Sequence, residues 1–332
     1  MKKKLVSLII INYNNKDYLS RCLNSIFEQT YEELEIIFID NESKDGSFKY
    51  MEEEYSNKNI LLIKNDINNG YAGAANQGIK LSTGEFIMII NPDIVMEKDF
   101  VEKLAFYMSN NLEVGAITGK LLKYDFSNNK KLNYIDSAGI EMYKSTRCID
   151  RGQNELDEGQ YNKTEEVFGV CGAAPMYRRN ALDLVKYKDE YFDEDFFAYK
   201  EDVDLSWRLN LIGQKNIYYP EAIAYHGRAL GRSEKGIFKF IKHRKKQSEF
   251  LRGISYRNHL MMLEKNKNSD FIIENKFKIN KRQLMLLIYS LIFEQFIFKF
   301  RKEAKLKFKL MNQKSNNLKE KNKIKSIRHL IK

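Results

Sequence analysis

The stretch Phe86-Ile-Met-Ile-Ile-Asn-Pro-Asp-Ile94 decides the fold, because a run of apolar residues ends abruptly on Asn91, Pro92 and Asp93. An apolar run of this length between Gly84 and Pro92 is typical of a strand covered on both faces, as in parallel α/β sheets. Proline cannot donate to a strand ladder, so we expect the strand to end there. Asp93 would then follow the carboxyl end of a buried strand, where open α/β sheets bind ligands and where phosphate ligands often bring a divalent metal.

A structural interpretation of Asp93 is also open. A helix is predicted from Lys98 to Met108, and an aspartate ahead of a helix can cap its first N–H groups. The stretch alone does not decide between a cap and a ligand.

The amino-terminal half alternates apolar runs with helical patterns. We predict strands at residues 5–11, 35–39, 60–64, 86–90 and 114–118, and helices at residues 17–28, 47–55, 72–80 and 98–108. This alternation predicts βαβ units and a mostly parallel sheet flanked by helices. Lysines before residues 5–11 imitate a signal peptide, but no small-residue cleavage site follows, so a first strand is favoured.

The following part of the chain is less regular. Residues 120–163 are polar and are predicted to form loops and short strands that shape a substrate cleft, together with residues 227–252. Helices are predicted at 180–185 and 201–211, and strands at 217–219 and 222–228.

The helix at residues 201–211 carries a candidate catalytic base. Leu205 and Leu209 belong to its apolar stripe, and Asp202 lies three residues before Leu205 on the same face. Asp202 should therefore point inward at the amino-terminal end of the helix, which suits a general base. A plain N-cap is the alternative.

Two further polar positions have structural and functional interpretations. Asp204 stands four residues before Arg208, a spacing that predicts an ion pair on the helix surface. His226 lies at the end of a predicted strand, and a lone histidine is more often structural than a ligand. A contact between His226 and Asp93 would favour the ligand.

Charge and cysteine content exclude several classes of protein. The net charge is +11, but residues 271–332 hold 17 Lys and Arg against four Glu, a local charge of +13, and the rest carries −2. The basicity therefore belongs to the tail, and we expect no nucleic-acid partner. Three widely spaced cysteines predict neither a disulfide framework nor a thiolate zinc site, and they suit a reducing cytoplasm.

The tail has two interpretations. Residues 283–298 are apolar at helical spacing but are too short and too polar at Glu294 and Gln295 to span a bilayer comfortably, and a basic run follows at residues 299–310. This pattern fits a peripheral anchor on the inner face of the cytoplasmic membrane. It fits equally a helix packed on the catalytic domain and followed by a solvated charged segment.

Five stretches in this order resemble the family-2 inverting glycosyltransferases with the GT-A fold. They are residues 6–14, residues 35–47 with Ile39-Asp-Asn-Glu-Ser-Lys-Asp-Gly-Ser47, Asn69-Gly-Tyr-Ala-Gly-Ala-Ala-Asn76, Asn91-Pro-Asp93 and Tyr199-Lys-Glu-Asp-Val-Asp204. The third, fourth and fifth look most like the rhamnosyltransferase branch. The likeness covers about residues 5–260, which suggests a catalytic domain at residues 1–265 and a basic helical tail at residues 266–332.

The resemblance implies a dTDP- or UDP-sugar donor, Mg²⁺ or Mn²⁺, and a saccharide or lipid-linked saccharide acceptor in cell-surface polysaccharide assembly. By position, Asp202 would be the base and Asp93 would bind the metal with His226. The donor nucleotide would be bound by Tyr13, Asp40, Asn69, Gly70, Asn76, Asn91 and Asp93, and Glu201, Asp204 and Arg208 would support the acceptor site.

The chain departs from the family pattern at two places. Many relatives have aspartate where this chain has Asn91, which leaves fewer carboxylates for the metal; Mg²⁺ tolerates one beside substrate phosphates. The Gln-x-x-Arg-Trp motif of processive relatives is absent, since the sole tryptophan is Trp207, and single addition is favoured.

Two other functions were weighed. A nucleotidyltransferase would need a glycine-rich loop after the first strand, and residues 12–17 contain no glycine. A basic adaptor that binds membrane or nucleic acid through its tail would release no nucleoside diphosphate from a donor.

Overall fold

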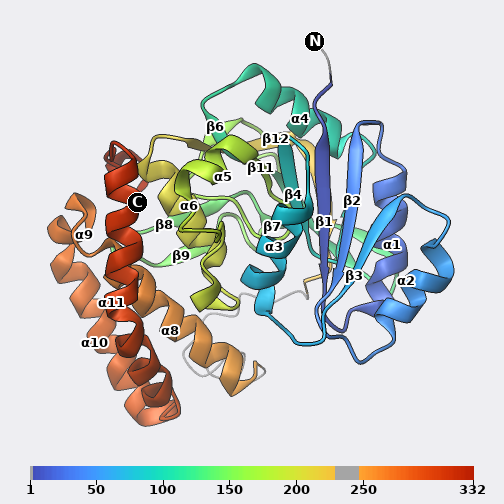
Figure 1. The fold of residues 1–332 in the computed structure, drawn as a ribbon. Coiled ribbons are helices and arrows are strands. Elements are labelled where there is room, and N and C mark those ends of the chain that lie inside the picture. Colours follow the sequence, from blue (N-terminus) through green and yellow to red (C-terminus); the bar gives the residue numbers. More distant parts are fainter. Residues whose placement is uncertain (1–2, 229–246) are drawn as a thin grey trace.

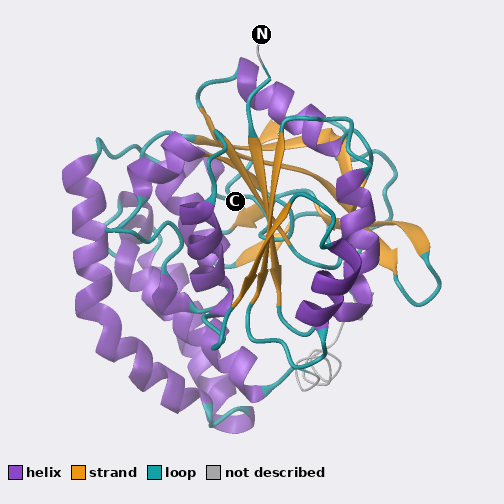
Figure 2. Ribbon diagram, turned by 45° about the vertical axis from the view of Figure 1, so that its right-hand side comes forward, coloured by secondary structure: helices purple, strands orange, loops and turns teal. Residues whose placement is uncertain are grey.

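The computed structural model describes residues 3–228 and 247–332. A twisted sheet crosses the molecule, with helices on both of its faces (Figures 1 and 2). The strands are β1 (Val6–Asn12), β2 (Leu34–Asp40), β3 (Ile60–Lys64), β4 (Phe86–Ile90), β5 (Ile94–Met96), β6 (Val114–Asp125), β7 (Lys130–Ser137), β8 (Ile140–Met142), β9 (Cys148–Asp150), β10 (Glu165–Glu166), β11 (Met176–Arg178) and β12 (Lys215–His226).

The helices alternate with the strands and then gather at the carboxyl end. They are α1 (Lys16–Phe27), α2 (Ser47–Tyr55), α3 (Gly70–Leu81), α4 (Phe100–Asn110), α5 (Arg179–Val185), α6 (Glu201–Leu211), α8 (Glu249–Asn266), α9 (Asp270–Glu274), α10 (Lys276–Phe293) and α11 (Ile297–Lys321), with short 3₁₀ turns η1 (Glu194–Phe196) and η2 (Arg328–Leu330).

The main sheet has the strand order β10-β12-β6-β11-β4-β1-β2-β3. Strand β1 is parallel to both β2 and β4, β2 is parallel to β3, and β6 is parallel to β12. The chain first builds outward from β1 to β3 and then returns to add β4 on the other side of β1. A reversal of this kind opens a crevice at the carboxyl ends of the two strands, here β1 and β4.

The central strands are buried on both faces, and alternate side chains enter two different cores. Leu8 and Ile10 of β1 pack with apolar residues of α1, α2 and α4, whereas Ile9 and Ile11 pack with α3, α5 and α6. This burial explains the unbroken apolar runs of the sequence, because a strand with helices on both sides has no solvent face.

The predicted mostly parallel α/β sheet is confirmed, and each strand and helix predicted between residues 5 and 108 is present within two residues of its expected ends. Further along, the strand predicted at residues 114–118 is longer than expected, because β6 continues to Asp125, and the short strands expected within residues 120–163 include β7, β8 and β9. Strand β12 joins two predicted strands into one with an irregularity after Tyr219, and the short β5 was not predicted.

The C-terminal helices pack on the catalytic half. Met261 and Met262 of α8 and Met311 of α11 share one core with Trp207 of α6. The apolar segment predicted at residues 283–298 is not one helix: α10 ends at Phe293, Glu294 is buried, and α11 begins at Ile297. Among the described residues, no helix is long and apolar enough to cross a bilayer.

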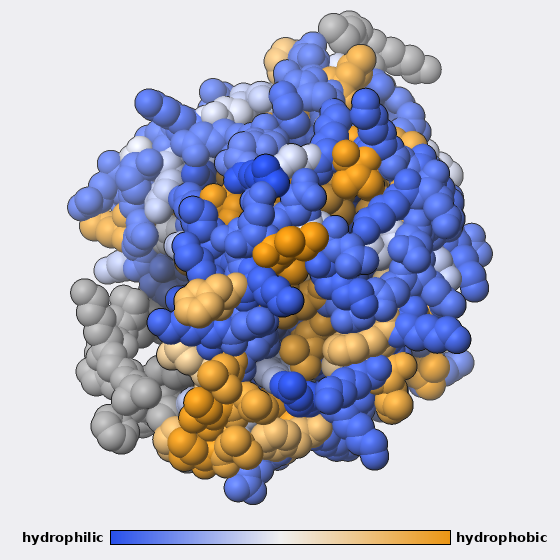
Figure 3. Space-filling model, turned by 90° about the vertical axis from the view of Figure 1, so that its left-hand side faces the viewer, coloured by the Kyte–Doolittle hydropathy of each residue, from blue (hydrophilic) through white to orange (hydrophobic). Residues whose placement is uncertain are grey.

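Helix α10 keeps apolar side chains at the surface. Apolar residues gather at the lower edge of the face shown in Figure 3. The exposed apolar side chains of α10 are Phe277, Leu284, Met285, Ile288, Leu291, Ile292 and Phe293. Within the tail, α11 therefore packs on the rest of the protein, while one face of α10 is left uncovered by the described residues.

Candidate active site

The crevice at the carboxyl ends of β1, β2 and β4 gathers polar residues. Asn12 ends β1 beside Asp40 at the end of β2, and the Asn12 amide donates to Asp40 Oδ2 over 3.0 Å. The Ser43 N–H donates to Asp40 Oδ1 over 2.8 Å. Asp40 is fully buried, so its carboxylate shapes the loop that follows β2. Tyr13 stands next to it with about half of its surface exposed (48%).

The start of α3 is fixed to the same crevice. The Asn69 N–H donates to the Asn41 side chain, whose amide in turn donates to the Gly70 carbonyl. Gly70 has φ +71°, and a Cβ there would lie 2.4 Å from the Phe197 carbonyl oxygen. Only glycine fits this position, both for its backbone conformation and for the close approach of Phe197.

Asp93 meets His226 at the end of β4. The strand β5 that follows Asp93 pairs with the end of β12, where His226 lies opposite Ile94. His226 Nε2 is 3.3 Å from Asp93 Oδ1, and His226 Nδ1 is 2.8 Å from Asp136 Oδ2. Asp93 is not a cap of α4, whose N-cap residue is Asp99. The contact with Asp93 that would favour His226 as a ligand is therefore present.

Each ring nitrogen of His226 faces a carboxylate. Burial alone would lower the pKa of His226, but the facing Asp93 and Asp136 carboxylates raise it to about 9. Burial alone would raise the pKa of Asp136, but its hydrogen bond to His226 and the charges of His226 and Arg228 lower it. Asp136 thus fixes the orientation of the ring and points Nε2 at Asp93.

These residues fit a divalent cation. A metal-bound histidine usually has its other ring nitrogen on a carboxylate, which is the arrangement of His226 on Asp136. A cation that takes Nε2 displaces its proton, since histidine binds metal only as the neutral ring. Within residues 3–228 and 247–332 no group of three or more His, Cys, Asp or Glu side chains is placed to hold a metal, so Asp93 and His226 would share it with substrate phosphates.

Asp202 lies at the start of α6, next to the same crevice. The N–H groups of Gly172 and Val203 donate to its two carboxylate oxygens over 3.2 and 2.7 Å. The carbonyl of the next residue, Ala173, accepts a hydrogen bond from the Asn91 N–H over 2.9 Å. Two adjacent residues of one segment therefore hold Asp202 on one side and the Asn-Pro-Asp stretch on the other.

The electrostatic environment suits Asp202 to a base. Burial raises the pKa of Asp202, and Lys200 offsets part of this effect. Burial and the neighbouring Asp202 carboxylate raise the pKa of Glu201 to about 8. A raised pKa makes the Asp202 carboxylate a better proton acceptor than an ordinary aspartate. Asp202 retains some exposed surface, whereas Glu201 is buried.

The sequence model of the glycosyl transferase family 2 matches residues 7–185, more than half of the chain, and this segment contains the crevice from β1 to β5. The chain belongs to glycosyl transferase family 2. Its sheet and helices form the GT-A fold expected for such a member.

The relatives of this family-2 chain include curated polysaccharide synthases. The poly-β-1,6-N-acetyl-D-glucosamine synthase of Staphylococcus epidermidis is 28% identical over 225 residues, which are 66% of this chain and 49% of that protein. The synthase of Staphylococcus aureus strain MSSA476 is 26% identical over the same shares. The chain spans about half the length of these relatives.

Solved structures share the fold of this family-2 chain. GalNAc-T7 with UDP, GalNAc and Mn²⁺ matches 79% of the chain and 48% of its own with a TM-score of 0.58 at 13% identity. The mannosyltransferase PcManGT from Pyrobaculum calidifontis, in complex with GDP-Man and Mn²⁺, matches 97% and 86% with a TM-score of 0.54 at 16% identity. S. aureus TarS with UDP-GlcNAc matches 83% and 70% with a TM-score of 0.52 at 16% identity.

The buried side chains of Asn76, Asp204 and Arg208 bind other residues of the protein interior. Asn76 is fully buried, and its amide donates to the Phe192 carbonyl and to Glu194 while its oxygen accepts from Tyr191 and Phe192. Both polar atoms of the Asn76 side chain are therefore engaged within the protein, and neither is left to bind the donor nucleotide. We correct the assignment of Asn76 to a structural role. Asp204 and Arg208 form the predicted ion pair (2.8 Å), but the surface position was wrong, because both are buried and Asp204 also binds Lys265.

Several residues of the site were not predicted from the sequence. Asp136 orients His226, Asn41 ties the end of β2 to α3, and Asn12 fixes Asp40. Asn12 and Asn41 could have been found, since each follows directly on an apolar strand, whereas Asp136 lies in a polar stretch with no signal. Of the cleft loop predicted at residues 227–252, residues 229–246 lie outside the described part of the chain.

Proposed function

We propose that this chain is a metal-dependent inverting glycosyltransferase that moves one sugar from a nucleotide-diphosphate donor to a saccharide or lipid-linked saccharide acceptor in cell-surface polysaccharide assembly. The observation that carries the proposal is the pairing of Asp202 with the Asn-Pro-Asp stretch through Gly172 and Ala173. This arrangement supports a base on one side of a sugar and a diphosphate site on the other.

The donor nucleotide would lie at the ends of β1, β2 and β4. The exposed ring of Tyr13 would pack on the base, and Asp40 would bind the base or ribose through the loop that it shapes. Asn69 and Gly70 at the start of α3 and Asn91 after β4 would line the diphosphate side.

Asp93 and His226 would hold the cation. When bound, a divalent cation neutralises the charge that develops on the leaving diphosphate. A carboxylate paired with an imidazole favours Mn²⁺ over Mg²⁺, because imidazole suits transition metals better. Mn²⁺ is also the cation named with GalNAc-T7 and PcManGT.

Asp202 would take the proton of the acceptor hydroxyl. The acceptor oxygen then bonds to the anomeric carbon as the bond from that carbon to the diphosphate oxygen breaks, and the leaving group departs with the electron pair. One displacement from the face opposite the leaving group inverts the anomeric configuration. Glu201, Asp204 and Arg208 would support α6, which carries the base.

Two observations bear on the donor sugar. The sequence motifs resemble the rhamnosyltransferase branch and favour dTDP-rhamnose, whereas the names of the staphylococcal synthases and the TarS complex favour UDP-GlcNAc. Single addition is favoured over processive synthesis because the tryptophan of the processive motif is missing and Trp207 is buried in α6.

We retain a catalytic domain at residues 1–265 and a tail at residues 266–332 as part of this proposal.

A donor panel tests the proposed function. Purified protein is incubated with UDP- and dTDP-sugars and Mn²⁺ or Mg²⁺, and released nucleoside diphosphate is measured. We expect one donor to give release that stops on addition of EDTA. An Asp93→Asn variant, matched in shape but uncharged, is expected to lose most of this release. Equal release by Asp93→Asn and wild type would remove Asp93 from the metal site.

The tail is proposed to touch the cytoplasmic face of the membrane through α10. Helix α10 also carries the exposed Lys281, Lys299 is exposed on α11, and basic residues together with an apolar face favour anionic lipid. We expect co-sedimentation with phosphatidylglycerol vesicles that weakens in high salt and in an Ile288→Ser/Ile292→Ser variant. Protein that stays in the supernatant at low salt would contradict this contact.

A further inference from the structure

The loop that leads from η1 into α6 has a strained backbone. Phe197, Tyr199 and Lys200 all have positive φ angles, of 65°, 68° and 74°. Residues other than glycine rarely adopt this conformation and keep it only where the surroundings impose it. Asp202 comes two residues after Lys200, so the course of this loop sets where α6 begins and where the Asp202 carboxylate lies.

Helix α8 imposes part of this conformation through Asn258. Asn258 is fully buried, and its side-chain nitrogen lies 2.7 Å from the Phe196 carbonyl oxygen, 2.8 Å from that of Ala198 and 2.8 Å from that of Tyr199. Arg257 adds hydrogen bonds from its guanidinium to the carbonyls of Asp195 and Phe196. These donors satisfy the carbonyls of Ala198 and Tyr199, and they add to the hydrogen bond that the Phe196 carbonyl already accepts from the Ala198 N–H.

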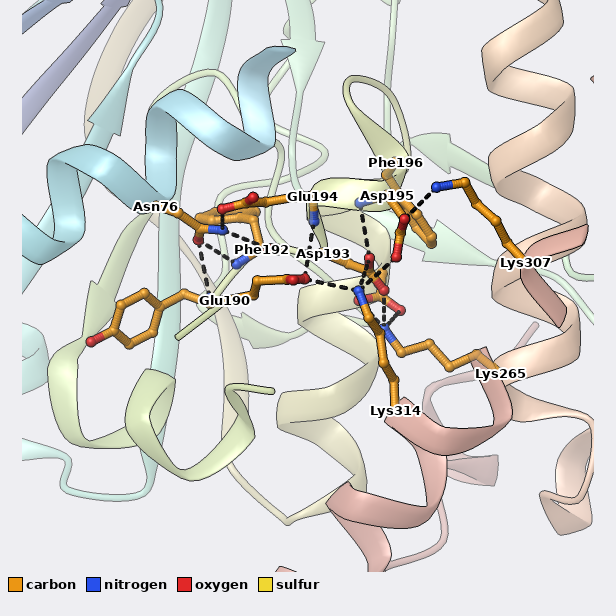
Figure 4. A network of polar contacts seen from close by, with 12 residues as sticks. Asn76, Glu190, Phe192, Asp193, Glu194, Asp195, Phe196, Lys265, Lys307 and Lys314 are labelled. Carbon is orange, nitrogen blue, oxygen red and sulfur yellow. Dashed lines mark hydrogen bonds and ion pairs between the residues drawn. The ribbon is translucent and has the colours of Figure 1, made fainter. Parts of the chain in front are cut away.

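Lysines of α8 and α11 bind the acidic residues that precede this loop (Figure 4). Lys314 of α11 reaches Asp193 over 2.6 Å, Asp195 over 2.9 Å and Glu190 over 2.8 Å. Lys265 of α8 bridges Asp193 and Asp204 over 2.8 and 2.9 Å.

The network is balanced in charge and includes the helix of the base. Lys307 of α11 pairs with Asp195, and Arg208 of α6 pairs with Asp204. Four cationic groups therefore face Glu190, Asp193, Asp195 and Asp204. Buried charges persist when each has such partners, so the loop and the start of α6 are tied to α8 and α11.

We propose that Asn258 is a positioning residue for sugar transfer: the C-terminal helices hold the strained loop at Phe197–Lys200 and thereby aim Asp202. This inference rests on the proposed role of Asp202 as the base. It places a determinant of the rate outside residues 7–185, the segment that the family model matches. Helix α8, supported by α11 of the tail, then serves catalysis by positioning Asp202.

The test compares Asn258→Leu, which keeps the side-chain volume and removes the donor, with Arg252→Met. Arg252 is a buried residue of the same helix that pairs with Glu294 within the tail, so its loss disturbs the tail and leaves the carbonyl bonds of Asn258 in place. Misplacing a catalytic group by about 1 Å costs roughly 10²-fold in rate. We expect kcat for transfer to fall 10- to 100-fold in Asn258→Leu, with the donor KM unchanged.

Two arms keep this test decisive. Lys307→Met removes a part-exposed lysine, so it is expected to fold even if Asn258→Leu does not, and its kcat should fall by a few-fold. The positioning role would be overturned if the folded variants among Asn258→Leu and Lys307→Met had the same kcat as Arg252→Met. It would also be overturned if the donor KM rose as much as kcat fell. Hydrogen exchange at Phe197–Lys200 needs no turnover and should be faster in Asn258→Leu than in Arg252→Met. Wild type that transfers no sugar would instead refute the proposed function, while the exchange result still tests the loop.

Discussion

Replacing Asp202 with asparagine is expected to lower sugar transfer by about 10²- to 10⁴-fold, the usual contribution of a general base. Asparagine keeps the shape of the side chain, and its oxygen can still accept from Gly172 or Val203. It cannot take a proton from the acceptor hydroxyl, because an amide is not basic. Donor binding is proposed to depend on residues after β1, β2 and β4 and should persist, so the loss should fall on kcat.

The control for this variant separates the base from the donor site. A thermal-shift titration with nucleotide and Mn²⁺ should give the same stabilisation in Asp202→Asn as in wild type, since ligand that binds only the folded state stabilises by RT ln(1 + [L]/Kd). Asp204→Asn is a poor control, because Asp204 is buried between Arg208 and Lys265. Full turnover by Asp202→Asn would remove Asp202 from the mechanism.

Replacing Lys314 with methionine is expected to destabilise the folded protein by roughly 3–5 kcal/mol, the range for removing one partner of a buried ion pair. The side chain of Lys314 is 2% exposed, and its loss leaves Glu190 without this cation, while Asp193 keeps Lys265 and Asp195 keeps Lys307. Unfolding in urea monitored by circular dichroism measures this change. Lys309→Met on the exposed side of the same helix should change stability by no more than about 0.5 kcal/mol.

The destabilisation by Lys314→Met should depend on pH. Burial alone would raise the pKa of Asp193, but Lys265 and Lys314 lower it well below its usual range. A carboxylate with a lowered folded pKa stabilises fully above its unfolded pKa of about 3.9, and this stabilisation is lost as pH falls through the folded pKa. The difference between Lys314→Met and wild type should therefore be largest near neutral pH and shrink in acid. A difference that does not vary with pH would show that packing, not charge, accounts for the loss.

Structural features that depend on residues close together in the sequence are predicted well. The strand ending just before Asn91 and the helix at residues 201–211 follow from local apolar patterns, and the crevice follows because parallel strands end at one edge. Asp93 and Asp202 are candidates for this reason, since Asp93 lies just after such a strand and Asp202 in the first turn of such a helix.

Contacts between distant segments could not be predicted in the same way. The spacing of Asp204 and Arg208 is the same on a buried helix as on an exposed one, so the spacing does not distinguish the two. Asp204 is buried against Lys265, which lies 61 residues after it in the chain. His226 meets Asp136 across 90 residues. Asn258 reaches carbonyl groups about 60 residues before it, and backbone groups leave no signature in the sequence.

The most direct test of the proposed mechanism is the rate of nucleoside diphosphate release from a nucleotide sugar with acceptor present, compared among wild type, wild type with EDTA, and Asp202→Asn. The proposed mechanism predicts release by wild type with Mn²⁺ or Mg²⁺, loss of release in EDTA, and release at least about 10²-fold slower in Asp202→Asn that still binds nucleotide. Wild-type release that is unchanged by both EDTA and Asp202→Asn, or no release from any UDP- or dTDP-sugar, would contradict it.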